Sequence, residues 1–456
     1  MKPGIELAYA LASLLFVAGL KMLSSPRTAR QGNLVSASGM LLAIVATLVH
    51  RDILDFQWIA VGLALGGTAG VLVARTVAMT AMPQMVALLN GWGGLASLLV
   101  AWEGFHRAPS LDTFTAAGVF FSVLIGGATF TGSVVAWAKL SETIPGRPLL
   151  FGGQRLVNVV LLTGALAVGG FFTLNQGGHG ALFPCLLGAS LLLGVLAVMP
   201  IGGADMPVVI ALLNSYSGLA AAATGFLLRN SMLIVTGALV GASGLILTRI
   251  MCRAMNRSLA SVLLGGFGTV DAGACGLANG EVKTISPTEA WPVLEAARSV
   301  VIVPGYGMAA AQAQHAVQEL AGLLEANDAE VRFAIHPVAG RMPGHMNVLL
   351  AEANVPYEQL VEMEAINPIM DTVDVCLVIG ANDVVNPAAY ENKSSPIYGM
   401  PIIDAHRART VLVLKRSLGP GFAGIENNLF SRPNARLLLG DAKASLQALT
   451  TGFKRA

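Results

Sequence analysis

The stretch VVIVPGYGMAA, residues 300–310, joins a short apolar run to the pattern G-x-G-x-x-A. We expect a buried strand over residues 299–304 and a helix over residues 312–324. Gly305 allows a tight turn, Gly307 lets the backbone approach a pyrophosphate, and the small third residue lets the helix pack on the strand. Phosphates then meet the amino end of the helix. The pattern predicts the start of a Rossmann-like dinucleotide-binding unit.

The composition divides the chain into two parts. Only 12% of the residues are charged and the mean hydropathy is +0.68, which argues against a wholly soluble protein. Residues 1–258 hold 14 Lys and Arg against 7 Asp and Glu, whereas residues 259–456 hold 14 against 19. We therefore expect a charge-poor membrane domain followed by an ordinary globular domain. The cysteines show neither C-x-x-C nor metal-ligand spacing, so we expect no metal site.

Runs of about 20 apolar residues in the first part predict nine membrane-spanning helices. The first run is not typical of a cleaved signal peptide, because Glu6 interrupts its start, Lys21 follows it and no small-residue cleavage motif comes after it. The nine predicted spans lie near residues 5–23, 33–49, 57–74, 82–102, 114–137, 156–173, 181–199, 206–228 and 231–251.

The charges between these spans predict the orientation of the chain, because cytoplasmic loops of membrane proteins are rich in Lys and Arg. On the side opposite the carboxyl terminus lie four such residues, Lys2, Arg51, Arg107 and Arg229. On the side of the carboxyl terminus lie ten: Lys21, Arg27, Arg30, Arg75, Lys139, Arg147, Arg155, Arg249, Arg253 and Arg257. This bias predicts a cytoplasmic carboxyl-terminal domain and an amino terminus outside.

A few polar residues fall in or beside the predicted spans, where burying them in hydrocarbon is costly. Asn90 and Asn214 lie mid-span and are placed to flank one hydrated cavity, with Ser217 close by in sequence. For each asparagine, an interhelical hydrogen bond and a transport role remain equally open. Asp205 opens a span at its cytoplasmic end, where we expect its charge to stay hydrated. Small-residue spacing, such as that beginning at Gly66, predicts close helix packing.

The second part begins with a Gly-rich connection over residues 259–290 and then alternates strands with helices. Within the connection, Ser286 and Glu289 form a capping-box pattern that predicts a helix start. Continuous apolar strands that alternate with helices indicate a doubly wound parallel sheet, which residues 291–456 are long enough to form. The strands are expected at residues 299–304, 330–335, 359–363, 374–380, 401–404, 410–415 and 436–439.

The loops at the carboxyl ends of these strands are the expected ligand site. An NAD site usually carries an acidic residue at the end of the second strand, where it binds the ribose 2′-hydroxyl. Here that strand ends in AIHP, residues 334–337, without an acid. Lys415 and Arg416 leave a later strand end and suit a 2′-phosphate, Arg by bidentate bonds and Lys as a point charge. The sequence therefore favours NADP over NAD.

In these motifs and several others the chain resembles the β subunit of proton-translocating NAD(P) transhydrogenase, almost from end to end. In the membrane part the resemblance is densest in GGADMPVV (202–209), LNSYSG (213–218), IVTGALVG (234–241) and MCRAMNRS (251–258). In the second part it continues in PGYGMA (304–309), IHPVAGR (335–341), IGAND (379–383) and GDAK (440–443). The resemblance implies a polytopic α-helical membrane domain followed by an α/β Rossmann-like domain.

The resemblance also implies that the second domain binds NADP(H), with the dinucleotide reversed relative to ordinary Rossmann enzymes. Lining the phosphates are then Gly305, Tyr306 and Gly307. Holding the nicotinamide half are Val338, Ala339, Gly340, Arg341, Met342, Pro343, Gly380, Ala381, Asn382, Asp383 and Val384. Reading the 2′-phosphate are Lys415, Arg416, Ser417, Leu418, Gly419, Pro420, Gly421 and Phe422, the last of which replaces a tyrosine common among relatives. Near the adenosine end lie Asp441 and Ala442, and a lid runs from Asp383 through Gly399 and Met400.

The implied reaction is direct hydride transfer from NADH on a partner α subunit to NADP⁺ on this chain, coupled to proton translocation. The nicotinamides do the chemistry, so no catalytic nucleophile or metal is expected. The α subunit carries the NAD(H) domain and further membrane helices. Two α–β units are expected to form a dimer in the lipid of a bacterial inner membrane, without nucleic acid.

The proton path implied by the resemblance departs from the family pattern at one position. Some relatives carry a membrane histidine where this chain has Asn90, so we expect the protonatable group on the partner's helices. On this chain the candidates for the path are Asn90, Asp205, Asn214 and Ser217.

An alternative from another class fits the physics of the sequence equally well. Nine spans and a nucleotide domain also suit an ion channel or carrier gated by a regulatory NADP-sensing domain without redox turnover. The missing acid after the second strand and the Lys415–Arg416 pair argue against an NAD sensor, but not against an NADP sensor. Hydride transfer in the presence of an α partner separates the enzyme from the sensor.

Overall fold

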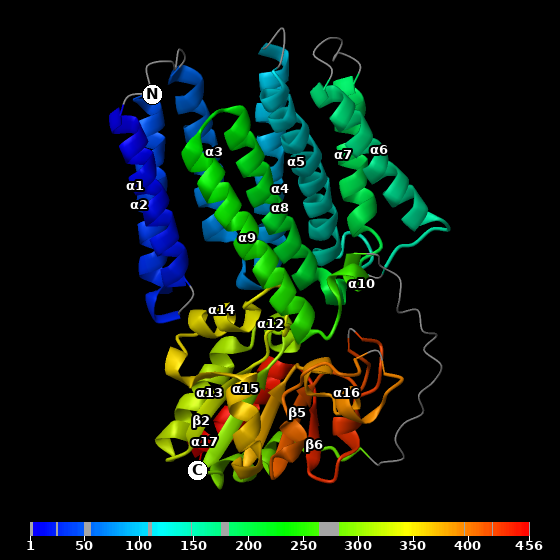
Figure 1. The fold of residues 1–456 in the computed structure, drawn as a ribbon. Coiled ribbons are helices and arrows are strands. Elements are labelled where there is room, and N and C mark those ends of the chain that lie inside the picture. Colours follow the sequence, from blue (N-terminus) through cyan, green and yellow to red (C-terminus); the bar gives the residue numbers. More distant parts are fainter. Residues whose placement is uncertain are drawn as a thin grey trace. The chain divides into compact units, whose positions relative to one another are not determined.

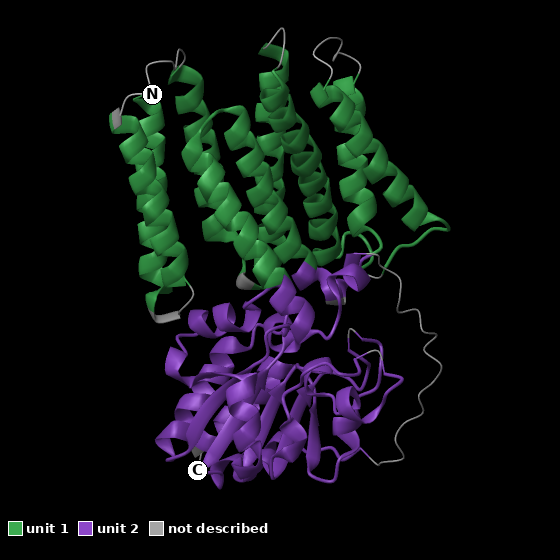
Figure 2. Ribbon diagram, in the orientation of Figure 1, with its two compact units in different colours: residues 1–200, 209–248 green, residues 201–208, 249–456 purple. Residues whose placement is uncertain are grey.

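The computed structural model describes residues 3–23, 26–49, 56–107, 112–146, 148–174, 182–263, 282–395, 397–421 and 423–455. Most of the predicted Gly-rich connection, residues 264–281, lies outside them. The chain divides into two compact units, drawn in different colours in Figure 2. Unit 1 comprises Met1–Pro200 and Val209–Thr248, and unit 2 comprises Ile201–Val208 and Arg249–Ala456.

Long apolar helices make up unit 1 (Figure 1). In the described residues eight helices are long and apolar enough to cross a membrane, and α7, with 17 residues, is a shorter apolar helix. All of them coincide with predicted spans, which confirms a polytopic helical membrane domain. The helices are α1 (Pro3–Leu23), α2 (Pro26–Leu48), α3 (Phe56–Thr76), α4 (Met82–Arg107), α5 (Thr113–Leu140), α6 (Gln154–Leu174), α7 (Leu182–Val198), α8 (Met206–Leu227) and α9 (Ser231–Ala254).

Glycines bring neighbouring helices of unit 1 into close contact. A Cβ built on Gly94 of α4 would lie 2.8 Å from the carbonyl oxygen of Gly126 on α5, and one on Gly126 would lie 2.7 Å from the oxygen of Gly94. A Cβ on Gly218 of α8 would lie 2.4 Å from the backbone nitrogen of Gly241 on α9. Such approaches are possible only without a side chain, as expected for small-residue packing in membranes.

Helix α3 differs from its neighbours because none of its residues is buried. The small-residue spacing at Gly66 and Gly70 therefore meets no other helix of the described chain, and a Cβ on either glycine would have nothing within 4 Å. Large apolar side chains such as Trp58 and Leu65 are also exposed. An apolar helix of 21 residues exposed in this way suits lipid or a protein partner rather than water.

Unit 2 is built on one six-stranded sheet in the order β3-β2-β1-β4-β5-β6, and every pair of neighbours is parallel. The order changes direction between β1 and β4, which is the switch point where ligands bind in doubly wound sheets. This topology confirms the expected Rossmann-like domain. The strands are β1 (Ser299–Pro304), β2 (Glu330–Ile335), β3 (Leu360–Glu362), β4 (Val375–Ile379), β5 (Thr410–Lys415) and β6 (Ala435–Leu439).

Helices cover the sheet of unit 2 (Figure 1), and its central strands β1 and β4 are buried except for Ser299. Val301 and Val303 of β1 join an apolar layer with Ile366 and Met370, from the segment after β3. Because the residues between them are buried as well, both faces of the sheet are covered, which explains the uninterrupted apolar runs in the sequence. The α-helices of unit 2, not all of which cover the sheet, are α10 (Leu259–Leu263), α11 (Pro287–Glu295), α12 (Tyr306–Ala310), α13 (Gln314–Ala326), α14 (His345–Glu352), α15 (Met363–Ile366), α16 (Ala388–Glu391) and α17 (Ala442–Arg455).

The strand predicted over residues 401–404 is wrong, since this segment belongs to no strand. Pro401 has no N–H to donate to a ladder. A side chain also takes the groups that a neighbouring strand would need: Asn367 Nδ2 donates to the Ile402 carbonyl (2.8 Å), and Asn367 Oδ1 accepts from the Asp404 N–H (3.0 Å). The apolar run is therefore held by loop contacts instead of by pairing.

Two helix starts refine the predictions made from the sequence. The helix predicted over residues 312–324 is α13, which begins at Gln314 after the separate short helix α12. The break lies at Gln312, whose φ of 50° is left-handed and cannot continue a helix. The capping box of Ser286 and Glu289 is confirmed at the start of α11.

Candidate functional site

Each of the six strands is followed by a connection at the carboxyl edge of the sheet; the ones considered below follow β1, β2, β4, β5 and β6. Together they contain the nucleotide-binding residues predicted from the sequence. Because the strands are parallel, their carboxyl ends lie at one edge. The structure thus brings these residues to one side of unit 2, with the exception of Phe422, which lies outside the described residues.

The glycines after β1 pack against the loop that follows β4. The N–H of Gly305 donates to the Ile379 carbonyl and that of Gly307 to the Gly380 carbonyl, both at 2.9 Å. A Cβ on Gly305 would lie 2.4 Å from the Ala381 Cα, and one on Gly307 would lie 2.6 Å from the Gly380 Cα. The close approach that Gly307 permits is therefore to the backbone of Gly380, and the two loops form one base for a ligand.

His336 fixes the loop that follows β2. Its ring is 2% exposed, Nδ1 accepts from the Val338 N–H (3.2 Å), and Nε2 bonds the Pro401 carbonyl (2.9 Å). Since Nδ1 accepts, the ring is neutral and donates from Nε2. Burial lowers the pKa of His336 to about 4, which keeps it neutral at physiological pH. The histidine ties the loop of residues 338–343 to the end of the predicted lid.

Tyr306, Arg341 and His345 form a cluster between the connections after β1 and β2. The Arg341 guanidinium lies 4.2 Å above the centre of the Tyr306 ring. The His345 ring lies 6.3 Å from that ring, and its Nδ1 accepts from the Arg341 N–H at 3.0 Å. Burial and the neighbouring Arg341 lower the pKa of His345 to about 4. Within the same loop Ala339 and Met342 are buried.

The loops after β4 and β5 are locked together by side-chain bonds. Asp383 Oδ2 accepts from the Ala423 N–H, and Asn427 Nδ2 donates to the Asn382 carbonyl, both at 2.9 Å. A Cβ on Gly421 would lie 2.4 Å from Asp383 Oδ1. Val384, which follows Asp383, is buried. The two loops therefore behave as one preformed surface beside the glycine turn.

The predicted Lys415–Arg416 pair is divided by the structure. The Lys415 ammonium donates to the Gly419 carbonyl and lies 4.7 Å from the centre of the Phe430 ring. Burial lowers the pKa of Lys415, against the opposing effect of Asp383. Arg416 is exposed and has no hydrogen bond or ion pair with any described residue. Lys415 thus stabilises the loop after β5 by bonding its backbone, whereas Arg416 is available to bind an anion.

The remaining predicted contacts surround this edge. In the predicted lid, Gly399 has a φ of 77° and donates its N–H to the Ala389 carbonyl (2.8 Å), and Met400 is buried. After β6, Asp441 Oδ1 accepts from the Ala444 N–H (3.0 Å) at the start of α17. Ser417, Leu418, Gly419 and Pro420 are exposed, and Ala442 is buried.

In unit 1 the predicted polar residues separate into a bonded group and an exposed one. Asn90 Nδ2 donates to Ser133 Oγ (2.9 Å), and Ser217 Oγ donates to Asn90 Oδ1 (2.6 Å), which joins α4, α5 and α8. Asn214 is exposed and bonds no described residue. Asn214 lies three residues before Ser217 on α8, so a shared cavity with Asn90 stays a prediction. Sequence reasoning missed Ser133, whose role depends on a contact distant in sequence.

Asp205 is buried rather than hydrated as expected. It is 8% exposed, and its Oδ1 lies 3.3 Å from the Arg257 guanidinium. Burial raises the pKa of Asp205, whereas the nearby Arg257 lowers it. The expectation of a hydrated carboxylate failed because the partner lies 52 residues away in the sequence.

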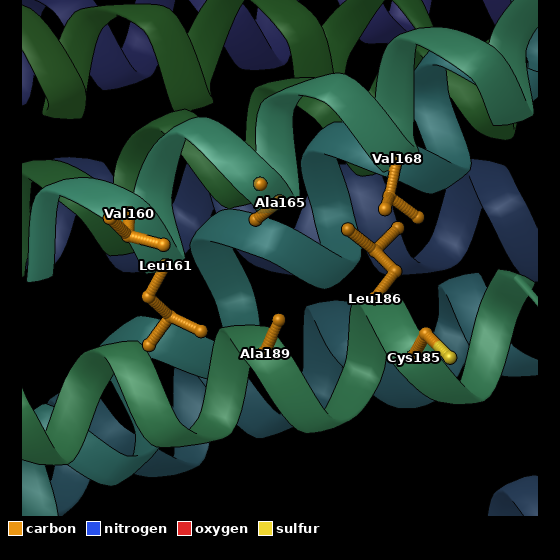
Figure 3. Close-up of a pocket in the computed structure, with 8 residues that line it drawn as sticks. Val160, Leu161, Ala165, Val168, Cys185, Leu186 and Ala189 are labelled. Carbon is orange, nitrogen blue, oxygen red and sulfur yellow. The ribbon is translucent and has the colours of Figure 1, made fainter. Parts of the chain in front are cut away.

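A cavity of about 190 Å³ lies between α6 and α7 of unit 1 (Figure 3). Its lining, which falls wholly within the described residues, contains no charged side chain. A dinucleotide needs partners for its phosphates, so this cavity does not suit one. The lining residues are Val160, Leu161, Gly164, Ala165, Val168, Cys185, Leu186 and Ala189.

Comparison with known proteins finds similarity to one family. The family model described as NAD(P) transhydrogenase beta subunit matches residues 5–452. Two curated relatives from Rhodospirillum rubrum, one of them from a named strain, are each called NAD(P) transhydrogenase subunit beta. Each is 48% identical to this chain over 447 residues, which cover 96% of the chain and 96% of the relative.

Proposed function

Because this chain belongs to the NAD(P) transhydrogenase β-subunit family, we propose that its residues 291–456 bind NADP(H) and that a partner α subunit binds NAD(H). The protein is a subunit of an oxidoreductase that couples hydride transfer between nicotinamide nucleotides to proton translocation. We assign proton translocation to residues 1–258. Residues 259–290 form the Gly-rich linker that joins this domain to the NADP(H)-binding domain.

The observation that carries the choice of NADP(H) is the exposed Arg416 at the end of β5, without a partner in the described structure. The connection after β2 contains no acidic residue for a ribose 2′-hydroxyl. A guanidinium at this edge offers bidentate bonds to a 2′-phosphate, which NAD lacks. Lys415 supports the same site by holding the loop that presents Arg416.

The described residues fit a dinucleotide at this edge. A Cβ at Gly305 or Gly307 would collide with the backbone after β4, so the glycines bring the two loops together as one base made of backbone. The buried Nε2 of His345 bonds no described residue. When bound, NADP(H) gives or receives hydride at its nicotinamide ring. This chain binds and orients the dinucleotide through its preformed loops and needs no acid, base or metal for that step.

The membrane part supports a partner subunit. Asn214 exposes a polar amide in the middle of a span, where contact with lipid alone is costly. Helix α3 has no buried residue and leaves Gly66 and Gly70 open. Helices of the α subunit would cover both surfaces. The group of Asn90, Ser133 and Ser217 can order water but cannot titrate near neutral pH, so we place the protonatable group on that subunit.

We further propose the setting of the complex. The ten cationic residues on one side of the spans against four on the other favour a cytoplasmic unit 2 and an amino terminus outside. The membrane is then the bacterial inner membrane, and two α–β units form the complete enzyme. A nucleotide-gated channel or carrier without redox turnover is disfavoured by membership of the transhydrogenase family.

Binding of nucleotides to the full chain tests the proposal. The purified chain, held in lipid nanodiscs without an α subunit, should bind NADP⁺ at least about tenfold more tightly than NAD⁺, since only NADP⁺ gains a charge-assisted bond. A preference for NAD⁺, or equal affinity for both, would contradict the assignment.

A further inference from the structure

His345 is almost fully buried, at 1% exposure, at the first position of α14 and beside the glycine turn after β1. We propose that its Nε2–H donates a hydrogen bond to an oxygen of the nicotinamide half of the bound dinucleotide. This inference rests on the proposed function and adds a positioning residue for the cofactor that the sequence did not indicate. The oxygen belongs to the carboxamide or to the adjoining ribose, both of which are neutral acceptors.

The bonds of the ring identify which nitrogen carries the proton and is left without a partner. Nδ1 accepts a hydrogen bond from the Arg341 backbone N–H at 3.0 Å, so it carries no proton. A neutral imidazole has one N–H, which must then be on Nε2. That nitrogen is buried and bonds no atom of the described residues. A buried donor without a partner costs free energy, and an acceptor on a ligand removes this cost.

The surroundings hold the ring in one position. Gly340 has a φ of 109°, and a Cβ there would lie 2.6 Å from His345 Nδ1, so the loop passes directly over the ring. Arg341 is itself stacked on Tyr306, 4.2 Å from its centre. The histidine is therefore fixed to two connections of the carboxyl edge, where doubly wound sheets bind their ligands.

The charge of the ring suits both states of the cofactor. Burial and the neighbouring Arg341 lower the pKa of His345 to about 4, so the ring stays neutral at physiological pH. A neutral donor does not repel the positive nicotinamide ring of NADP⁺, and it bonds the same oxygen in NADPH. The bond therefore orients the nicotinamide half without favouring one oxidation state through charge.

Two substitutions distinguish the role of Nε2 from the role of Nδ1. Asn at position 345 keeps an acceptor near Nδ1 for the Arg341 N–H but has no group at Nε2, whereas Gln places an amide donor near Nε2. In full-length protein in nanodiscs, His345→Asn should weaken NADP⁺ binding about three- to tenfold, the effect of one hydrogen bond. Adenosine 2′,5′-bisphosphate, which lacks the nicotinamide half, should bind the variant as it binds the parent. His345→Gln should recover most of the NADP⁺ affinity.

The outcomes distinguish this inference from its alternatives. Unchanged NADP⁺ affinity in His345→Asn, or equal weakening of both ligands, would overturn it, because Nε2 would then meet only water or the histidine would only support the fold. If the variant does not fold, the ¹⁵N resonance of His345 Nε2 in the parent protein tests the inference instead. NADP⁺ should shift this resonance, and adenosine 2′,5′-bisphosphate should not. The same shift with both ligands would also overturn the inference. A folded parent that binds no NADP⁺ contradicts the proposed function itself.

Discussion

Replacing Arg416 with Ala removes the one group at the end of β5 that distinguishes NADP⁺ from NAD⁺ in this account. Arg416 is exposed and bonds no described residue, so its loss breaks no internal contact. A charge-assisted bond contributes about 1.5–3 kcal/mol, and exposure to water favours the lower value. A loss of about 1.5 kcal/mol weakens NADP⁺ binding roughly tenfold.

The assay is equilibrium binding of NADP⁺ and NAD⁺ to full-length protein in nanodiscs. NAD⁺ affinity should stay within about twofold, since NAD⁺ lacks the phosphate that Arg416 bonds. Arg436→Ala is the matched control: it removes the same charge from β6, where the guanidinium bonds the Pro433 and Ala435 carbonyls at 2.8 Å. Neither affinity should change in this control.

Lys415→Ala gives a second contrast at the same strand end. Its ammonium holds the Gly419 carbonyl, so its loss should loosen the whole loop and weaken NADP⁺ and NAD⁺ together. If Arg416→Ala weakens both nucleotides equally, or if Arg436→Ala has the same effect as Arg416→Ala, the reasoning about the 2′-phosphate is refuted.

Three further predictions follow from the described contacts. Gly307→Ala should lower the melting temperature and abolish nucleotide binding, since its Cβ would lie 2.6 Å from the Gly380 Cα; Gly322→Ala, with nothing within 4 Å, should do neither. Buried His336 has its pKa lowered from 6.5 to about 4, so the folded state should lose up to about 3 kcal/mol of stability as pH falls from 6.5 to 4, and a His336→Gln variant should show a smaller loss in acid denaturation. Asp205→Asn, which leaves its arginine partner without a counter-charge, should impair proton pumping in vesicles and NADPH release together; normal rates of both would show that the pair is only structural.

The sheet and its functional edge were predictable because each depends on a local signal. The run of residues 300–304 is apolar because both faces of β1 are covered, and G-x-G-x-x-A requires a backbone contact that side chains would block. The connection after β2 without an acidic residue and the residues Lys415 and Arg416 lie at the same edge of the sheet, because all its strands are parallel. The topology then brought these loops to one side.

The features that failed or were missed depend on partners distant in sequence. Residues 401–404 have the composition of a strand, but Asn367 bonds their backbone. Asp205 looked hydrated because its span begins there, but Arg257 is its partner in a buried pair. His345 has no assigned role in the sequence analysis, and only the fold shows that one of its nitrogens is buried without a bond to the described chain. Such contacts have no signal in a single sequence.

Hydride transfer in the assembled complex tests the central claim most directly. The chain and an α partner are reconstituted into proteoliposomes with NADH carrying deuterium at the transferred position, and NADP⁺ reduction is followed together with the pH of the lumen. Direct transfer predicts that the deuterium appears in NADPH without exchange into water, and that the lumen pH changes only while turnover continues. Binding of NADP⁺ without reduction, or loss of the deuterium to solvent, would contradict the account.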